Sequence, residues 1–60
     1  MKSAEVEDYA RRLLSAHGDR AEAEAAQKVR ECEERGDAAQ AGDWRRIREV
    51  IRRMRGPNES

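Results

Sequence analysis

The fold is decided by the stretch ERGDAAQ at residues 34–40, in which a helix stop is followed at once by a helix start. Gly36 suits the left-handed conformation just past the end of many helices. Asp37 is a preferred residue for capping the next helix. Gln40 follows three residues later, as the second member of a capping box does. The stretch therefore predicts two helices joined by a tight turn.

The same pair of residues occurs earlier, in AHGDRAE at residues 16–22. Gly18 would end a helix and Asp19 would cap the next one, with Glu22 in the third position after the cap. Two junctions divide the chain into three helices, predicted at about residues 3–17, 20–35 and 38–55. The predicted fold class is all-α, as a small bundle or a helical hairpin plus a third helix.

Apolar residues of the first predicted helix, which we expect Ser3 to cap, share one face because they recur at intervals of three and four. They are Val6, Tyr9, Ala10, Leu13, Leu14 and His17. The second helix carries a flat line of small residues, Ala21, Ala25, Val29 and Cys32. Small side chains permit close approach, so we expect this helix to be the middle one, packed against both others.

The third predicted helix has the strongest apolar seam, formed by Trp44, Ile47, Ile51 and Met54. A glycine inside a helix costs about 1 kcal/mol relative to alanine, and Gly42 with Asp43 repeats the junction motif. A start at Asp43 is therefore the alternative to a start near residue 38. Pro57 disfavours helical geometry in the residue before it. We expect one helical domain over residues 1–56 and a flexible tail over residues 57–60.

Sixty residues is below the size at which a chain buries a comfortable core. Cys32 is the only cysteine, which excludes an internal disulfide, and His17 is the only histidine, so a Cys/His zinc site has too few ligands. We therefore expect no metal and no cofactor, and we expect oligomerisation to complete the core. Charged residues make up 43% of the chain, a balance that disordered chains share, so disorder until binding is an alternative.

Catalytic groups are not expected. A nucleophilic cysteine needs a base held nearby, and His17 is better explained by its favourable position at a helix C-terminus. The start of the chain is neither a secretory signal nor a transit peptide, and no stretch approaches the length of a membrane span. An unpaired cysteine without an export signal fits a reducing compartment. The sequence thus predicts a cytoplasmic protein that is not an enzyme.

Arginines dominate the third predicted helix, where six stand against Glu49 alone between Trp44 and Gly56. Four of them form a basic stripe beside the apolar seam: Arg45, Arg48, Arg52 and Arg55. They either pair with glutamates of the second helix and the acidic start of the first, or they contact a nucleic acid. A formal net charge of zero and a shortage of aromatic residues argue against the nucleic acid.

The stretch YARRLL at residues 9–14 with HGD at 17–19, followed by Gly36, Asp37, Trp44 and Ile47, resembles short uncharacterised bacterial helical proteins. That resemblance covers most of the chain and implies no activity. Residues 26–41 and beyond also resemble a tetratricopeptide helix pair, but such arrays need about three repeats, which this chain cannot hold. That second likeness extends only to local packing.

The sequence therefore predicts a small protein–protein interaction module or regulator. Its expected partner is a second copy, giving a dimer, or a larger protein, and nucleic-acid binding through the third helix is the alternative. The expected interaction seam is Tyr9, Leu13, Trp44, Ile47, Ile51 and Met54. The expected basic rim, which would select the partner or its orientation, is Arg45, Arg48, Arg52 and Arg55.

Overall fold

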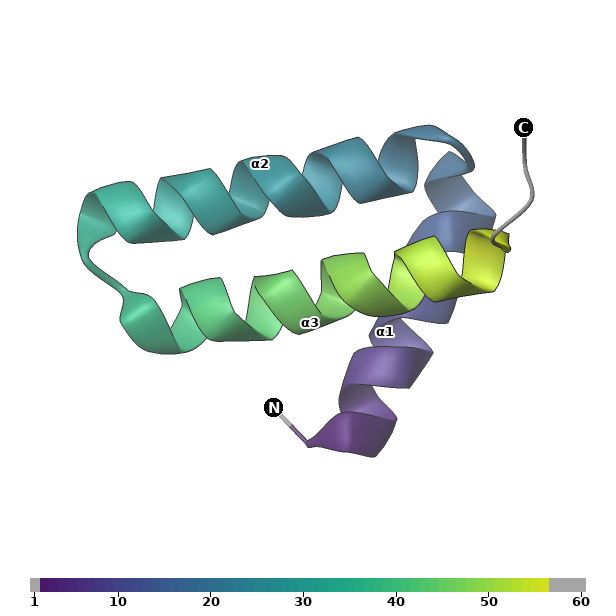
Figure 1. Cartoon of the computed structure of the whole chain (residues 1–60), viewed down its shortest axis with the longest axis horizontal. Coiled ribbons are helices and arrows are strands. Elements are labelled where there is room, and N and C mark those ends of the chain that lie inside the picture. Colours follow the sequence, from purple (N-terminus) through teal and green to yellow (C-terminus); the bar gives the residue numbers. More distant parts are fainter. Residues whose placement is uncertain (1, 57–60) are drawn as a thin grey trace.

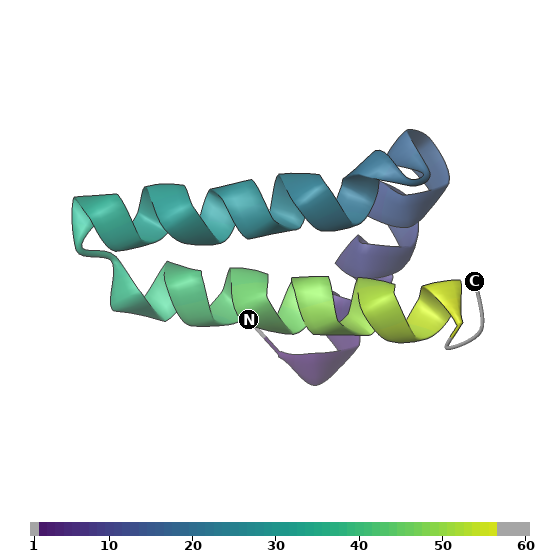
Figure 2. The ribbon, with the colours of Figure 1, turned by 45° about the horizontal axis from the view of Figure 1, so that its top comes forward.

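The computed structural model describes residues 2–56 and contains three helices in that range: α1 (Ser3–His17), α2 (Arg20–Arg35) and α3 (Ala38–Arg55). Helices α2 and α3 form an antiparallel hairpin, and α1 crosses the C-terminal half of α3 (Figures 1 and 2). The predicted all-α class and the three predicted helix ranges are confirmed. The predicted tail, residues 57–60, lies outside the described residues.

Helix α3 is the middle helix of the three. Its interface with α2 is the most extensive, its interface with α1 is second, and the interface between α1 and α2 is the smallest. Our expectation that α2 would occupy the middle is therefore wrong. The physical reason is that α3 supplies the large core side chains, Ile47, Val50 and Ile51, which fill the space toward both neighbours.

The turn after α2 ends that helix through paired backbone hydrogen bonds. Gly36 is left-handed, with φ 78° and ψ 20°. Its N–H donates to the Glu33 carbonyl at 3.0 Å, and the Asp37 N–H donates to the Cys32 carbonyl at 2.8 Å. This is the Schellman arrangement. The predicted glycine stop at residue 36 is confirmed.

The start of α3 is capped by Asp37, whose Oδ1 accepts a hydrogen bond from the Gln40 N–H at 3.1 Å. The helix therefore begins at Ala38, and the alternative start at Asp43 is wrong, because Gly42 lies inside the helix. The side chain of Gln40 does not close the predicted box onto Asp37. Its Oε1 faces the thiol of Cys32 instead, at 3.9 Å.

The junction between α1 and α2 is built differently. Gly18 has φ 59° and ψ −129°, while Asp19 has helical dihedrals of −62° and −19° and makes no side-chain capping hydrogen bond. Asp19 holds the predicted cap position before Arg20, but the predicted capping contact is absent, because a capping side chain needs a non-helical backbone at its own residue. The predicted cap at Ser3 is wrong: Ser3 is the first residue of α1, and Lys2 holds the cap position, its N–H donating to Glu5 Oε1 at 3.3 Å.

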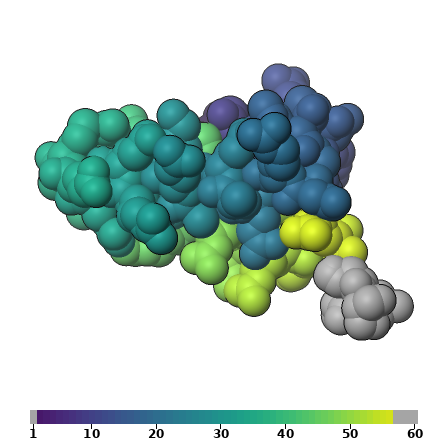
Figure 3. Space-filling model, turned by 90° about the horizontal axis from the view of Figure 1, so that it is seen from above, coloured from purple at the N-terminus to yellow at the C-terminus, as the bar shows by residue number. Residues whose placement is uncertain are grey.

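The core lies where the three helices meet, and all three contribute to it. Its buried members are Val6, Ala10, Ala21, Ala25, Ile47, Val50 and Ile51. Val29 and Cys32 of α2 and Ala41 of α3 are buried as well. Leu13, Leu14 and Trp44 pack against it while partly exposed. Within residues 2–56, no buried side-chain nitrogen or oxygen lacks a hydrogen-bond partner. Seen from above, α1 is confined to one part of the molecule, next to the start of α2 (Figure 3).

Candidate interaction surface

An aromatic pair joins α1 to α3 at the edge of the core. The rings of Tyr9 and Trp44 have centroids 5.5 Å apart and planes at 87° to each other. This edge-to-face arrangement places the positive rim of one ring against the negative face of the other. Tyr9 remains 41% exposed and Trp44 is half-buried. The pair therefore holds α1 on α3 and also presents aromatic surface to solvent.

The structure divides the predicted seam between the core and the surface. Ile47 and Ile51 are fully buried within one chain, sharing the core with residues of α1. Leu13 and Trp44 are half-buried, whereas Tyr9 and Met54 are exposed. Trp44 and Met54 are ten residues apart, about 15 Å along a helix axis. The exposed part of the seam thus consists of the aromatic pair with Leu13, and Met54 at a distance.

Three of the four predicted rim arginines are paired with carboxylates of α2 and its N-terminal flank. Arg45 pairs with Glu33, and Arg52 Nε lies 3.3 Å from Glu22 Oε2. Arg55 donates from Nη1 to Glu22 Oε1 at 3.0 Å and also lies 3.7 Å from Asp19 Oδ1. The described chain contains no ion pair of the fourth, Arg48. The basic stripe is therefore largely an internal edge of the hairpin.

These ion pairs agree with one of the two explanations that the sequence left open, the pairing of arginines with glutamates of the second helix. The expected pairing with the acidic start of α1 is not found among residues 2–56, where Asp8 instead pairs with Arg12 at 3.4 Å. Arg45 and Arg52 keep side-chain exposures of 57% and 61%. Exposed pairs of this kind contribute about 0–1 kcal/mol each.

Glu22 is the residue of this edge that sequence reasoning missed, since we had assigned it to a capping box. A signal existed, because a tight turn at Gly36 places the helices on either side of it next to each other and in opposite directions. Glu22 and Glu33 lie on one side of α2 at helical spacing, and the arginines of α3 run past them in the opposite direction. Opposed stripes of unlike charge on consecutive helices predict such an edge.

A shallow cleft of about 320 Å³ lies between the start of α1 and α3. Its lining residues are Ser3, Val6, Glu7, Arg46, Glu49, Val50 and Arg53. Ligand pockets are mostly apolar with a few placed polar groups, whereas this one is lined by two arginines and two glutamates. Its two valines are already buried in the core. The cleft does not have the character of a small-molecule site.

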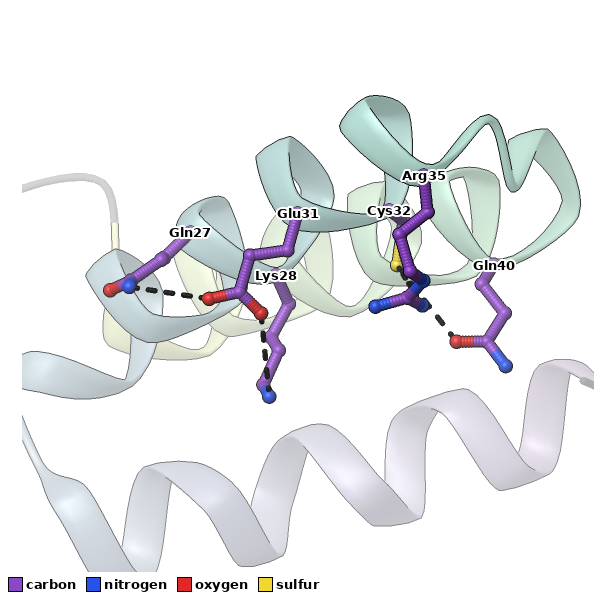
Figure 4. Close-up of polar contacts among 6 residues, drawn as sticks. All are labelled: Gln27, Lys28, Glu31, Cys32, Arg35 and Gln40. Atoms are coloured by element: carbon purple, nitrogen blue, oxygen red, sulfur yellow. Dashed lines mark hydrogen bonds and ion pairs between the residues drawn. The ribbon is translucent and has the colours of Figure 1, made fainter.

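Cys32 is buried near the α2–α3 turn, in contact with two polar side chains (Figure 4). Arg35 Nη2 donates to its sulfur at 3.6 Å, and the thiol faces Gln40 Oε1 at 3.9 Å. On the same helix, Glu31 accepts from Gln27 at 3.4 Å and pairs with Lys28 at 3.7 Å. The thiol is buried between α2 and α3, as expected for a member of the small-residue face of α2.

His17 is the last residue of α1 and lies beside the first turns of α2, whereas Cys32 lies in the last turn of α2. Its Nδ1 is 3.1 Å from Glu24 Oε2, and Glu24 precedes Cys32 by eight residues, about 12 Å along the helix. The imidazole is therefore not placed to act as a base for the thiol. Within residues 2–56, no group of three or more histidine, cysteine or acidic residues could hold a metal ion.

Comparison with protein-family models, with curated proteins and with solved structures finds no match to this chain. Among the described helices, none combines the length and the apolar character that crossing a bilayer requires.

Proposed function

We propose that the chain is a small protein–protein interaction module that associates with a second copy of itself through the exposed aromatic surface around Tyr9 and Trp44. A larger protein is the alternative occupant of that surface. The observation that carries the proposal is the 41% exposure of Tyr9 while its ring is held by Trp44. Aromatic residues are enriched in protein interfaces and in their energetic hot spots.

The position of this surface supports the proposal further. Tyr9 is fixed by its contact with Trp44, so binding would order few additional side-chain rotamers. Ordering rotamer-rich side chains is one of the main costs of association. Half-buried Leu13 lies one helical turn beyond Tyr9 on α1 and extends the apolar area. A second copy covering this area would remove the largest aromatic side chains of the chain from water.

Nucleic-acid binding through α3 is the weaker candidate. A polyanion would have to compete with Glu22 and Glu33 for three of the α3 arginines. Binding that depends on phosphate contacts is retained at low salt and falls steeply as salt is raised. Strong retention on nucleic acid, weakened by Arg48→Ala, would favour it over the proposal.

We include in the proposal that the chain has no catalytic role and acts in the cytoplasm.

The test compares the solution masses of two variants, each with one residue replaced by serine. Tyr9→Ser removes the exposed ring, and we expect it to shift the dimer toward the 6.9 kDa monomer. Ala23→Ser is the matched control, because Ala23 is exposed on the outer side of α2, and it should leave the mass unchanged. Circular dichroism checks that both variants keep their helix content. Equal masses for both folded variants would contradict the proposal.

A further inference from the structure

Gly18 is the only residue between α1 and α2 with a non-helical backbone. Helix α1 ends at His17, and Asp19 already has helical dihedrals before α2 begins at Arg20. Gly18 itself has φ 59° and ψ −129°. A change in the two dihedrals of this one residue would therefore join residues 3–35 into a single helix about 50 Å long.

Opening at Gly18 would cost few backbone hydrogen bonds. The Gly18 N–H donates to the Leu14 carbonyl at 2.8 Å, four residues back, which is also the bond of a continuous α-helix. The Ala21 N–H reaches the Gly18 carbonyl at 3.1 Å and would find the position-17 carbonyl instead. The junction thus contains little that holds the bend apart from the packing of α1.

The second junction, although its sequence is similar, is locked. Both Gly36 and Asp37 are non-helical there, with Asp37 at φ −96° and ψ 81°. The two Schellman hydrogen bonds and the cap onto Gln40 fix the turn. The α2–α3 interface is also the most extensive in the molecule and carries the arginine–glutamate pairs. The hairpin is therefore one unit, to which α1 is attached by a single-residue hinge.

Detaching α1 would expose apolar surface on both parts. Val6 and Ala10 on α1 would leave Ile47, Val50 and Ile51 on α3, all of which are buried in the closed chain. The surface that matches each exposed face best is the equivalent face of a second copy, because the closed contacts can re-form between chains unchanged. Exchange of an identical element is a low-cost route to a dimer.

We infer that α1 of one copy can occupy the α1 position on the α2–α3 hairpin of a second copy, with Gly18 as the hinge. The occupant is thus a named segment of the same chain. Tyr9 of one copy then contacts Trp44 of the other. The inference goes beyond the proposed function, since exchange re-forms contacts already present in the monomer and does not need the exposed aromatic surface.

Gly18→Ala is the first test. Nothing lies within 4 Å of a Cβ at this position, so the substitution acts on backbone preference alone. An L-residue disfavours the positive φ of the bend, and alanine is the better helix former. We expect the open state to be favoured by about tenfold or more per chain. The variant should be dimeric with its helix content retained.

Gly36→Ala is the matched control, because Gly36 also has a positive φ and no neighbour within 4 Å of a Cβ. It should strain the locked turn without producing exchange. Replacement of Gly18 by D-alanine is the opposite variant, accessible by synthesis in a chain of this length. The dihedrals of Gly18 mirror an extended conformation that L-residues readily adopt, so D-alanine should hold the bend closed.

The decisive readout is nuclear magnetic resonance on an equal mixture, unfolded and refolded together, of isotope-labelled and unlabelled chains. For Gly18→Ala we expect the Tyr9–Trp44 ring contact to appear between labelled and unlabelled chains. A contact confined to single chains, or the same interchain contact in Gly36→Ala, would overturn the inference. If Gly18→Ala does not fold, the test uses concentrated wild-type protein, which must show the Tyr9–Trp44 contact between chains. The D-alanine variant at position 18 should reduce that interchain contact about tenfold or more. An interchain contact that is absent from the wild type, or unchanged by D-alanine, overturns the inference. Exchange without wild-type dimers would count against the proposed function alone.

Discussion

Glu22 and Arg55 are separated by 33 residues in the chain and joined by a 3.0 Å hydrogen bond that ties the start of α2 to the end of α3. Their side chains are only 24% and 30% exposed. The second oxygen of Glu22 lies 3.3 Å from Arg52. One carboxylate thus holds two arginines at the open end of the hairpin, opposite the Gly36 turn.

Glu22→Gln should lower the free energy of unfolding by about 0.5–1 kcal/mol, because it removes the charge that pairs with both arginines. The loss should shrink at high salt, since screening already weakens the wild-type pairs. Urea titrations at low and high sodium chloride measure both effects. Glu34→Gln is the control, at an exposed position that has no ion pair in the described chain. Equal losses in the two variants would show that the pairs contribute nothing.

Asp37→Ala should cost about 1 kcal/mol of stability, because the Asp37 carboxylate caps α3 by accepting from Gln40 N–H. Asp19→Ala should cost less, about 0.5 kcal/mol or below, because Asp19 makes no capping bond and its contact with Arg55 is highly exposed. Thermal unfolding of the two variants side by side tests the difference. If Asp19→Ala proved the more damaging, the distinction between the two junctions would be mistaken.

Ile47→Ala should destabilise the chain by about 2–5 kcal/mol, because the Ile47 side chain is completely buried and its truncation leaves a cavity in the core. That is a large part of the total stability of a small domain. Circular dichroism should show a chain that is mostly unfolded or unfolds at much lower urea. Met54→Ala is the control at a position 37% exposed, and it should cost much less. Comparable losses would place Met54 in the core.

Tyr9→Ala should cost about 1–2 kcal/mol, as the edge-to-face contact with Trp44 is lost together with part of the ring burial. The near-ultraviolet circular dichroism of Trp44 should weaken, because the side chain loses the neighbour that fixes its orientation. Tyr9→Phe keeps the ring and should preserve both stability and signal. A full signal in Tyr9→Ala would mean that Trp44 is held by other contacts.

The helix limits could be predicted from the sequence because they depend on local chemistry. Gly36 and Asp37 act within a few residues of themselves, and both did so as expected. Gly18 and Asp19 are the same dipeptide, but their backbone conformation also depends on how α1 packs onto α3. The predicted glycine stop was therefore confirmed at both junctions, while the aspartate cap was confirmed at one.

The surface could be predicted only in part, because coverage depends on how helices cross. Periodicity placed Trp44, Ile47 and Met54 on one face of α3, and it could not reveal that α1 would cover the centre of that face. The crossing buries Ile47 and leaves Met54 exposed. The identity of the middle helix was mispredicted for the same reason. The large side chains of α3 fill the space toward both neighbours, so α3 and not the small-residue helix α2 lies in the middle.

The most direct test of the proposed self-association is the mass of the wild-type chain by light scattering over a dilution series, with circular dichroism on the same samples. We predict a dimer of twice 6.9 kDa that dissociates on dilution while its helix content is kept, because the core closes within one chain. A mass of 6.9 kDa at every concentration would contradict the account.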